Sequence, residues 1–135
     1  MLDLLQSVPW TAVKRVRDWI RSRYATAPWP QRVDSVYVDL GAEEFQARLE
    51  NRYWEDASPY SLQYDGEVLN LRRPNGFSDE FGHYRELHLR ARETPDGLLE
   101  CNAHEEPNRY LEKTAHVNET GLEWLNQSEL EALLS

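Results

Sequence analysis

Two histidines occupy positions where the chain predicts two neighbouring strands, and their spacing places the rings side by side. His88 precedes and His104 follows Pro95-Asp96-Gly97, a triplet typical of a type I turn closed by a glycine in the left-handed conformation. If these three residues form the loop, Thr94 lies opposite Leu98, and equal outward steps bring His88 opposite His104. A two-residue Asp-Gly loop would shift the strands by one position and separate the rings.

The same register predicts a hairpin with one polar and one largely apolar face, because successive side chains alternate across a strand. The predicted polar face carries Glu86, His88, Arg90, Arg92, Glu100, Asn102, His104 and Glu106. The opposite face carries Leu87, Leu89, Ala91, Leu99, Cys101 and Ala103. We expect Cys101 to be a small buried thiol rather than a nucleophile.

Adjacent imidazoles suit two kinds of chemistry. They bind zinc, iron or manganese, with Glu86 or Glu106 as a third ligand. His116, beyond the strand break at Pro107, could turn back as a further ligand. Alternatively, the two rings act as an acid–base pair near neutral pH, because histidine titrates there. The pattern therefore supports the hypothesis of a metal-dependent or histidine acid–base hydrolase, with His88 and His104 as its catalytic residues.

Polar neighbours of the histidines extend this hypothesis to a substrate. Arg90 and Arg92 could hold an anionic group by bidentate contacts, and Asn102 lies opposite Arg90. The alternative needs no function at all, since a polar outer face is usual for an antiparallel sheet. In that case Arg92 and Glu100 form an ordinary cross-strand ion pair of small energetic value.

The elements around this hairpin predict an α+β fold with a mainly antiparallel sheet of four or five strands and helices on one face, in the order α-β-α-β-β-β-β-α. The predicted helices span 3–24, 42–54 and about 118–134, the last in one or two pieces and with Ser128 and Glu131 as a capping box. The predicted strands span 33–40, 60–64, 68–72, 84–93 and 98–105, with turns at Asp65-Gly66 and at 73–76. We expect the second face of the sheet to be open to water and to carry any site.

The 135 residues fit one domain, in which 1–30 form an amphipathic helix with a Pro/Trp linker and 31–135 form the sheet body and the C-terminal helix. The sequence shows neither a transmembrane stretch nor a secretory leader, so we expect no membrane association. A single cysteine is compatible with the reducing cytoplasm. The net charge of −9, with 13 arginines against two lysines, predicts a salt-adapted organism. A GC-rich genome would also replace lysine by arginine.

The sequence contains no common cofactor-binding motif, but it has an aromatic cluster and a basic first helix. The sequence lacks a P-loop, a dinucleotide fingerprint and an HExxH motif, so no cofactor is expected beyond a divalent ion, Zn or Mn. Trp54, Tyr60 and Tyr64 form an aromatic cluster that suits either an interface or the edge of the core. Nucleic-acid association through the basic first helix is a further alternative, although the acidic net charge of the whole chain argues against it. We therefore expect a cytoplasmic interaction or ligand-binding protein, with a protein partner or a second copy.

Overall fold

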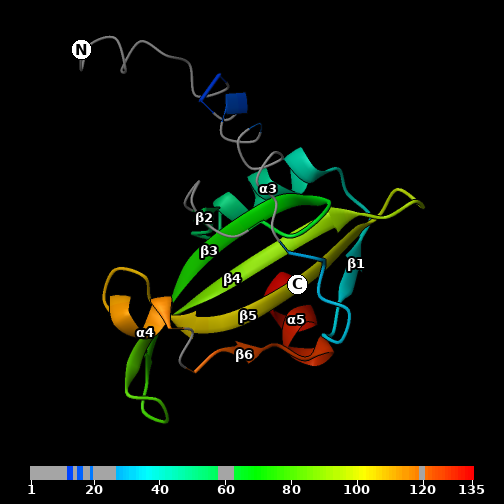
Figure 1. Cartoon of the computed structure of the whole chain (residues 1–135). Helices are drawn as coiled ribbons and strands as arrows, with labels where there is room; N and C mark the ends of the chain where they lie inside the picture. The colour runs from blue at the N-terminus through cyan, green and yellow to red at the C-terminus, as the bar shows by residue number, and fades with distance from the viewer. Residues whose placement is uncertain (1–11, 14, 17–18, 20–26, 58–62, 119–120) are drawn as a thin grey trace, which may run out of the picture.

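The computed structural model describes residues 12–13, 15–16, 19, 27–57, 63–118 and 121–135. Its centre is a sheet with the strand order β1-β5-β4-β3-β2, in which every pair of neighbouring strands is antiparallel (Figure 1). These strands are β1 (Val36–Val38), β2 (Glu55–Asp56), β3 (Glu67–Ser78), β4 (His83–Glu93) and β5 (Leu99–Pro107). A sixth strand, β6 (Glu123–Trp124), pairs with the C-terminal half of β5, at His104 and Glu105. The predicted α+β fold with a mainly antiparallel sheet is confirmed.

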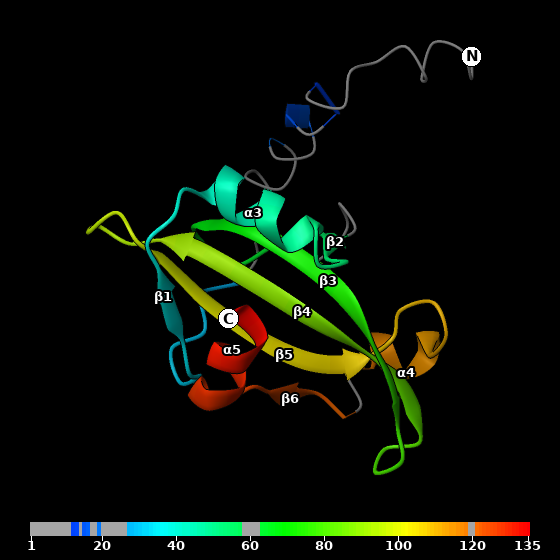
Figure 2. The ribbon, with the colours of Figure 1, turned by 180° about the vertical axis from the view of Figure 1, so that it is seen from behind.

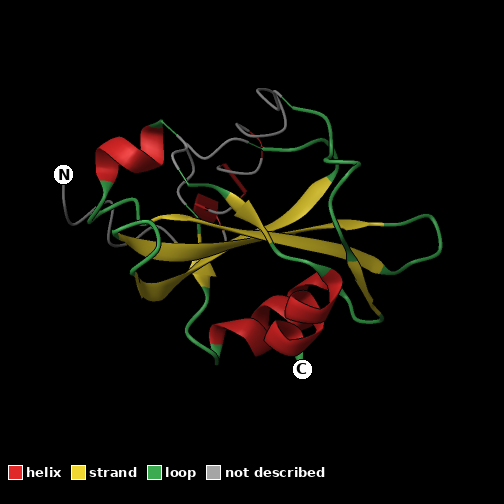
Figure 3. Ribbon diagram, turned by 90° about the horizontal axis from the view of Figure 1, so that it is seen from below, coloured by secondary structure: helices red, strands yellow, loops and turns green. Residues whose placement is uncertain are grey.

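Helices α3 (Ala42–Glu50) and α5 (Gln127–Leu134) cover one face of this sheet (Figure 2). Phe45 and Leu49 of α3 and Leu130 of α5 pack on the sheet leucines, including Leu71 and Leu89, which have no exposed surface. Seen edge-on, the C-terminal helix lies against one side of the sheet (Figure 3). A short helix, α4 (Lys113–Val117), follows β5 at the end of the sheet. None of the helices in the described ranges is long and apolar enough to cross a bilayer.

The central β4–β5 hairpin has the predicted register throughout. His88 pairs with His104, and the flanking pairs are Arg90 with Asn102 and Glu86 with Glu106. The Thr94 N–H donates to the Leu98 carbonyl at 2.8 Å, which closes the three-residue loop. Gly97 in this loop has a φ of 83°, the left-handed conformation that the turn type requires. The apolar face of the hairpin then joins the core beneath α3 and α5.

The predicted turn at residues 73–76 is wrong, because β3 continues through it to Ser78. Pro74 pairs with Glu86 and Phe77 with Tyr84, so two residues of β3 oppose one residue of β4. Gly76 has a φ of 73° there, which makes this segment a β-bulge rather than a reversal. The strand pair therefore extends beyond the sheet as a long hairpin, drawn in green below α4 (Figures 1 and 2).

The Asp65-Gly66 turn was predicted correctly, but the strand predicted to pair with β3 was not. Gly66 has a φ of 77°, and the Glu67 N–H donates to the Tyr64 carbonyl, so the Asp65-Gly66 turn is present. The strand beside β3 is β2, however, and not the predicted strand 60–64, of which 60–62 lie outside the described residues. Tyr64, just before the turn, forms an isolated parallel bridge with Ala27 instead of pairing with β3.

The C-terminal helix begins later than predicted. Strand β6 lies within the predicted span, and α5 begins at Gln127 and ends, as predicted, at Leu134. The capping box is formed by Asn126 and Glu129, not by Ser128 and Glu131. The predicted strand 33–40 is reduced to β1, and the predicted helix 42–54 ends at Glu50. Of the predicted helix 3–24, the described residues 12–13, 15–16 and 19 are helical, and the remainder lies outside the described residues.

Candidate metal site on the buried face of the sheet

The polar face of the central hairpin is buried, so the expectation of a face open to water is wrong. Its six inner members are each at most 7% exposed. They are Glu86, His88, Arg90, Asn102, His104 and Glu106. A buried polar group costs free energy unless it is paired, so each of these side chains requires a partner on this face.

Aromatic rings from distant segments cover this face. The Tyr64 ring lies over the Arg90 guanidinium at 4.3 Å, and the Trp29 ring over that of Arg92 at 4.9 Å. Tyr110 covers the Arg72 guanidinium of β3 in the same way, at 4.9 Å. The Trp124 ring of β6 meets the His104 ring edge-on, with 4.9 Å between centroids. The sequence carries no local signal for this cover, because these rings are brought together by long-range contacts.

Arginines on this face are neutralised by glutamates. Arg90 Nε lies 2.9 Å from a Glu67 oxygen, and Arg92 Nε lies 2.9 Å from Glu100. An anionic substrate at Arg90 or Arg92 would have to exchange with these carboxylates, so their role in substrate binding stays a prediction. Asn102, predicted beside them, is 1% exposed, and its amide nitrogen has no hydrogen-bond partner in the described part of the chain. Among the predicted substrate-binding residues, Asn102 therefore has a buried donor without a partner in the described residues.

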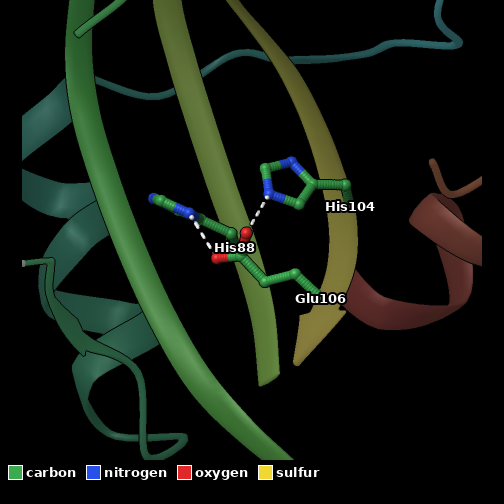
Figure 4. Close-up of side chains that lie close together, drawn as sticks. All are labelled: His88, His104 and Glu106. Carbon is green, nitrogen blue, oxygen red and sulfur yellow. Dashed lines mark hydrogen bonds and ion pairs between the residues drawn. The ribbon is translucent and has the colours of Figure 1, made fainter. Parts of the chain in front are cut away.

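Glu106 differs from the other carboxylates of the face because imidazoles are its hydrogen-bond partners within the described residues. His88 Nδ1 lies 3.1 Å from Glu106 Oε1, and His104 Nε2 lies 3.1 Å from Oε2 (Figure 4). Burial by itself would raise the pKa of Glu106, but the hydrogen bonds from His104 and His88 hold it well below its ordinary value. The ligand-type atoms of these three residues all lie within 4.8 Å of one another. The geometry thus gathers two nitrogens and a carboxylate around one point.

His88 is held by oxygen atoms on both sides of its ring. Nδ1 faces Glu106, and Nε2 faces the side-chain carbonyl oxygen of Asn70 on β3. The Asn70 amide nitrogen donates to Glu67 Oε2 at 3.2 Å, which fixes the carbonyl oxygen toward His88. Burial lowers the pKa of His88 to about 3; the hydrogen bond to Glu106 opposes this shift, and nearby Arg90 adds to it. A neutral ring carries one N–H, so one of the two oxygens faces a nitrogen without a proton.

The other predicted ligands, Glu86 and His116, lie beside this cluster but have partners of their own. A Glu86 oxygen accepts from Arg72 Nε at 2.8 Å, and the other accepts from the Arg109 backbone N–H at 2.6 Å. His116 Nδ1 lies 2.8 Å from the Pro107 carbonyl, to which it must donate, and 3.8 Å from Glu86 and from Glu106. Glu86, Glu106 and His116 form a second group of potential ligands, but Glu86 already accepts from Arg72 and Arg109, and His116 Nδ1 donates to the Pro107 carbonyl.

The remaining predicted residues fall into the core or outside the described residues. Trp54 is 2% exposed and belongs to the core cluster, and Tyr64 is half-buried over Arg90. This favours the edge of the core over an exposed interface for the aromatic cluster; Tyr60 lies outside the described residues. Cys101 is fully buried, and burial raises the pKa of its thiol to about 12.

Comparison of the chain with protein-family models, with curated proteins and with solved structures gave no match. The His88, His104 and Glu106 cluster is therefore the basis for a functional proposal. The sequence led to His88, His104 and Glu106 but missed Asn70, which fixes the ring of His88. The alternation of β3 carried that signal, since Asn70 pairs with Arg90 and so shares the polar face.

Proposed function

We propose that this chain is a metal-binding protein that holds a divalent ion, with zinc preferred, between His88 Nδ1, His104 Nε2 and Glu106. The observation that carries the proposal is the pair of oxygens around the His88 ring. A metal ion at Nδ1 leaves the proton on Nε2, where it is donated to Asn70 Oδ1. Ligating histidines commonly donate their second N–H to a carbonyl in this way, which sets the tautomer and the ring orientation.

Distances in the cluster support the proposal. Tetrahedral zinc with bonds of 2.0–2.2 Å separates its ligand atoms by about 3.3 Å. The two imidazole–carboxylate distances of 3.1 Å are close to that separation. Binding would then replace two hydrogen bonds by metal–ligand bonds. Two imidazoles and one carboxylate favour zinc over manganese, which prefers oxygen ligands.

Burial supports binding rather than catalysis. A hydrolytic zinc site keeps one coordination position for water or substrate. The three ligands here are each at most 7% exposed. The proposed function is accordingly to hold an ion, as a structural or storage site, and hydrolysis by His88 and His104 is the alternative that this burial favours less.

The proposed setting is a salt-adapted cytoplasm. The support is the net charge of −9, the excess of arginine over lysine and the single cysteine. Refolding yield measured against KCl concentration tests the salt adaptation. Full stability at low salt would contradict it.

The metal proposal is tested by zinc titration of the EDTA-treated protein against a chromophoric chelator, in concentrated KCl. We expect one zinc ion per chain, and cobalt substitution should give the intense visible absorption of a tetrahedral site. Glu106→Gln and His104→Gln should lose saturable binding, whereas Asn70→Leu should weaken it roughly 10- to 100-fold by freeing the His88 ring.

A matched control is present in the chain. His83 Nδ1 lies 3.3 Å from Glu112, so this pair resembles the imidazole–carboxylate contacts of the site but lacks a second histidine. His83→Gln should bind zinc as the unmodified protein does. The proposal fails if the unmodified chain binds no zinc, or if folded Glu106→Gln, checked by circular dichroism, binds as tightly.

A further inference from the structure

A groove of about 800 Å³ lies beside α5 on the helix-covered side of the sheet. Four of its lining residues form a row across the strands. Arg73 of β3 pairs with Leu87 of β4, Leu87 pairs with Glu105 of β5, and Glu105 pairs with Glu123 of β6. Directly opposed residues share a face of the sheet. The groove is separate from the proposed metal site, because adjacent residues of a strand, such as Leu87 and His88, point to opposite faces.

The two ends of this row carry opposite charges without a partner. Arg73 is half-buried with its guanidinium over the Trp54 ring at 4.9 Å, and it has neither an ion pair nor a hydrogen bond with the described residues. Burial and the positive charge of Arg52 lower the pKa of Arg73, whereas a neighbouring carboxylate would raise it. At the other end, Glu123 is exposed and also lacks a partner in the described part of the chain. The groove therefore favours an anion at Arg73 and a cation at Glu123.

Between these ends, the lining is apolar or already paired. Glu105 accepts from the Arg85 guanidinium and, at 2.6 Å, from the Asn75 amide. Apolar surface is supplied by Leu87, Leu125, Ala132 and Leu133. An occupant of the groove should therefore be apolar in its middle and carry opposite charges at its two ends.

Strand spacing sets the distance between those charges. Neighbouring strands lie about 4.8 Å apart, so three steps from β3 to β6 separate the backbones of Arg73 and Glu123 by about 14 Å. Both side chains can reach inward, which leaves roughly 10 Å between the charges of an occupant. An extended tripeptide spans about 10 Å from its ammonium to its carboxylate.

We propose that the groove binds a short apolar peptide of about three residues with free ends. Its C-terminal carboxylate would bind Arg73, whose guanidinium suits bidentate contact with a carboxylate. Its N-terminal ammonium would bind Glu123, and its apolar side chains would cover Leu87 and Leu133. This inference is independent of metal binding, because none of the proposed metal ligands lines the groove.

Calorimetric titration of the full chain with trileucine, at a constant KCl concentration, tests the proposal. We expect saturable binding of one peptide per chain. N-acetyl-trileucine lacks the ammonium and trileucine amide lacks the carboxylate, and each should bind at least about fivefold more weakly because one charged contact is lost.

Two variants assign the ends of the peptide. Arg73→Gln should weaken trileucine binding by about tenfold and should no longer distinguish trileucine from its amide. Glu123→Gln should no longer distinguish trileucine from the acetylated peptide, and its exposed position makes it independent of any folding defect in Arg73→Gln. Arg32→Gln and Glu93→Gln remove the same charges from exposed residues outside the groove and should bind as the unmodified chain does.

Absence of saturable trileucine binding to the folded chain overturns the proposal. Equal affinity for the three peptides overturns it as well, because the terminal charges then play no part. It also fails if Glu123→Gln, folded by circular dichroism, still discriminates against the acetylated peptide as the unmodified chain does.

Discussion

Acidification should destabilise the metal-free protein through His88. The folded state binds this proton with a pKa of about 3, against 6.5 for the ordinary side chain. Because the folded pKa is the lower one, the unfolded chain binds more protons as the pH falls below 6.5. His88 thus contributes stability that is present above pH 6.5 and is lost progressively between pH 6.5 and 3.

The size of this loss follows from the two pKa values. At pH 7.5 the unfolded imidazole is largely neutral, and the difference between the states is close to zero. At pH 5 protonation favours the unfolded chain by about 2 kcal/mol, from RT ln(1 + 10^1.5). Glu106 shifts in the same direction, but its window lies below pH 4.5, its ordinary pKa. The range between pH 7.5 and 5 therefore isolates the histidine.

The assay is urea unfolding followed by tryptophan fluorescence at pH 7.5, 6, 5.5 and 5, in EDTA and at constant KCl. His88→Gln should lose about 2 kcal/mol of the pH dependence between pH 7.5 and 5, whatever its stability at pH 7.5. His83→Gln should keep that part, since its ring is at the end of the sheet. Parallel stability–pH curves for the unmodified chain and His88→Gln would refute the assignment of a buried neutral ring.

Three further expectations test the fold. Cys101 should not react with Ellman's reagent in the native protein at pH 8 and should react at once in urea, because its buried thiol stays protonated. Gly76→Val should lower the free energy of unfolding by roughly 1–2 kcal/mol in urea titrations, since the bulge requires a positive φ; an unchanged midpoint would exclude the bulge. Asn126→Ala should cost about 1 kcal/mol as a lost helix cap, while Ser128→Ala should cost much less; the reverse order would restore the cap predicted from the sequence.

The hairpin around the histidines could be predicted residue by residue because local rules determine it. A three-residue Pro-Asp-Gly loop sets the register, and alternation sets the faces. One correct loop length therefore placed His88 against His104 and Cys101 in the core. The bulge at Gly76 could not be distinguished in this way, since Pro-Asn-Gly is compatible with both a turn and a left-handed bulge.

The burial of the polar face could not be predicted from the same rules. The covering rings of Trp29, Tyr64, Tyr110 and Trp124 come from segments far from the hairpin in sequence, and no periodicity links them to it. The two-residue strands β2 and β6 are too short to show alternation. Without the cover, the polar pattern resembles an ordinary solvated sheet surface, and with it the same residues become a buried charge network.

That network also indicates where function can reside. The ion pairs of Arg90 with Glu67 and Arg72 with Glu86 have almost no exposed surface, and removal of either partner would leave a buried charge, which is strongly destabilising. These ion pairs therefore have to stay intact as long as the protein is folded. A metal ion can replace the contacts of Glu106 with the imidazoles of His88 and His104 while these arginine–glutamate ion pairs stay intact. Glu106 and its two histidines can therefore bind an ion without breaking a buried arginine–glutamate pair.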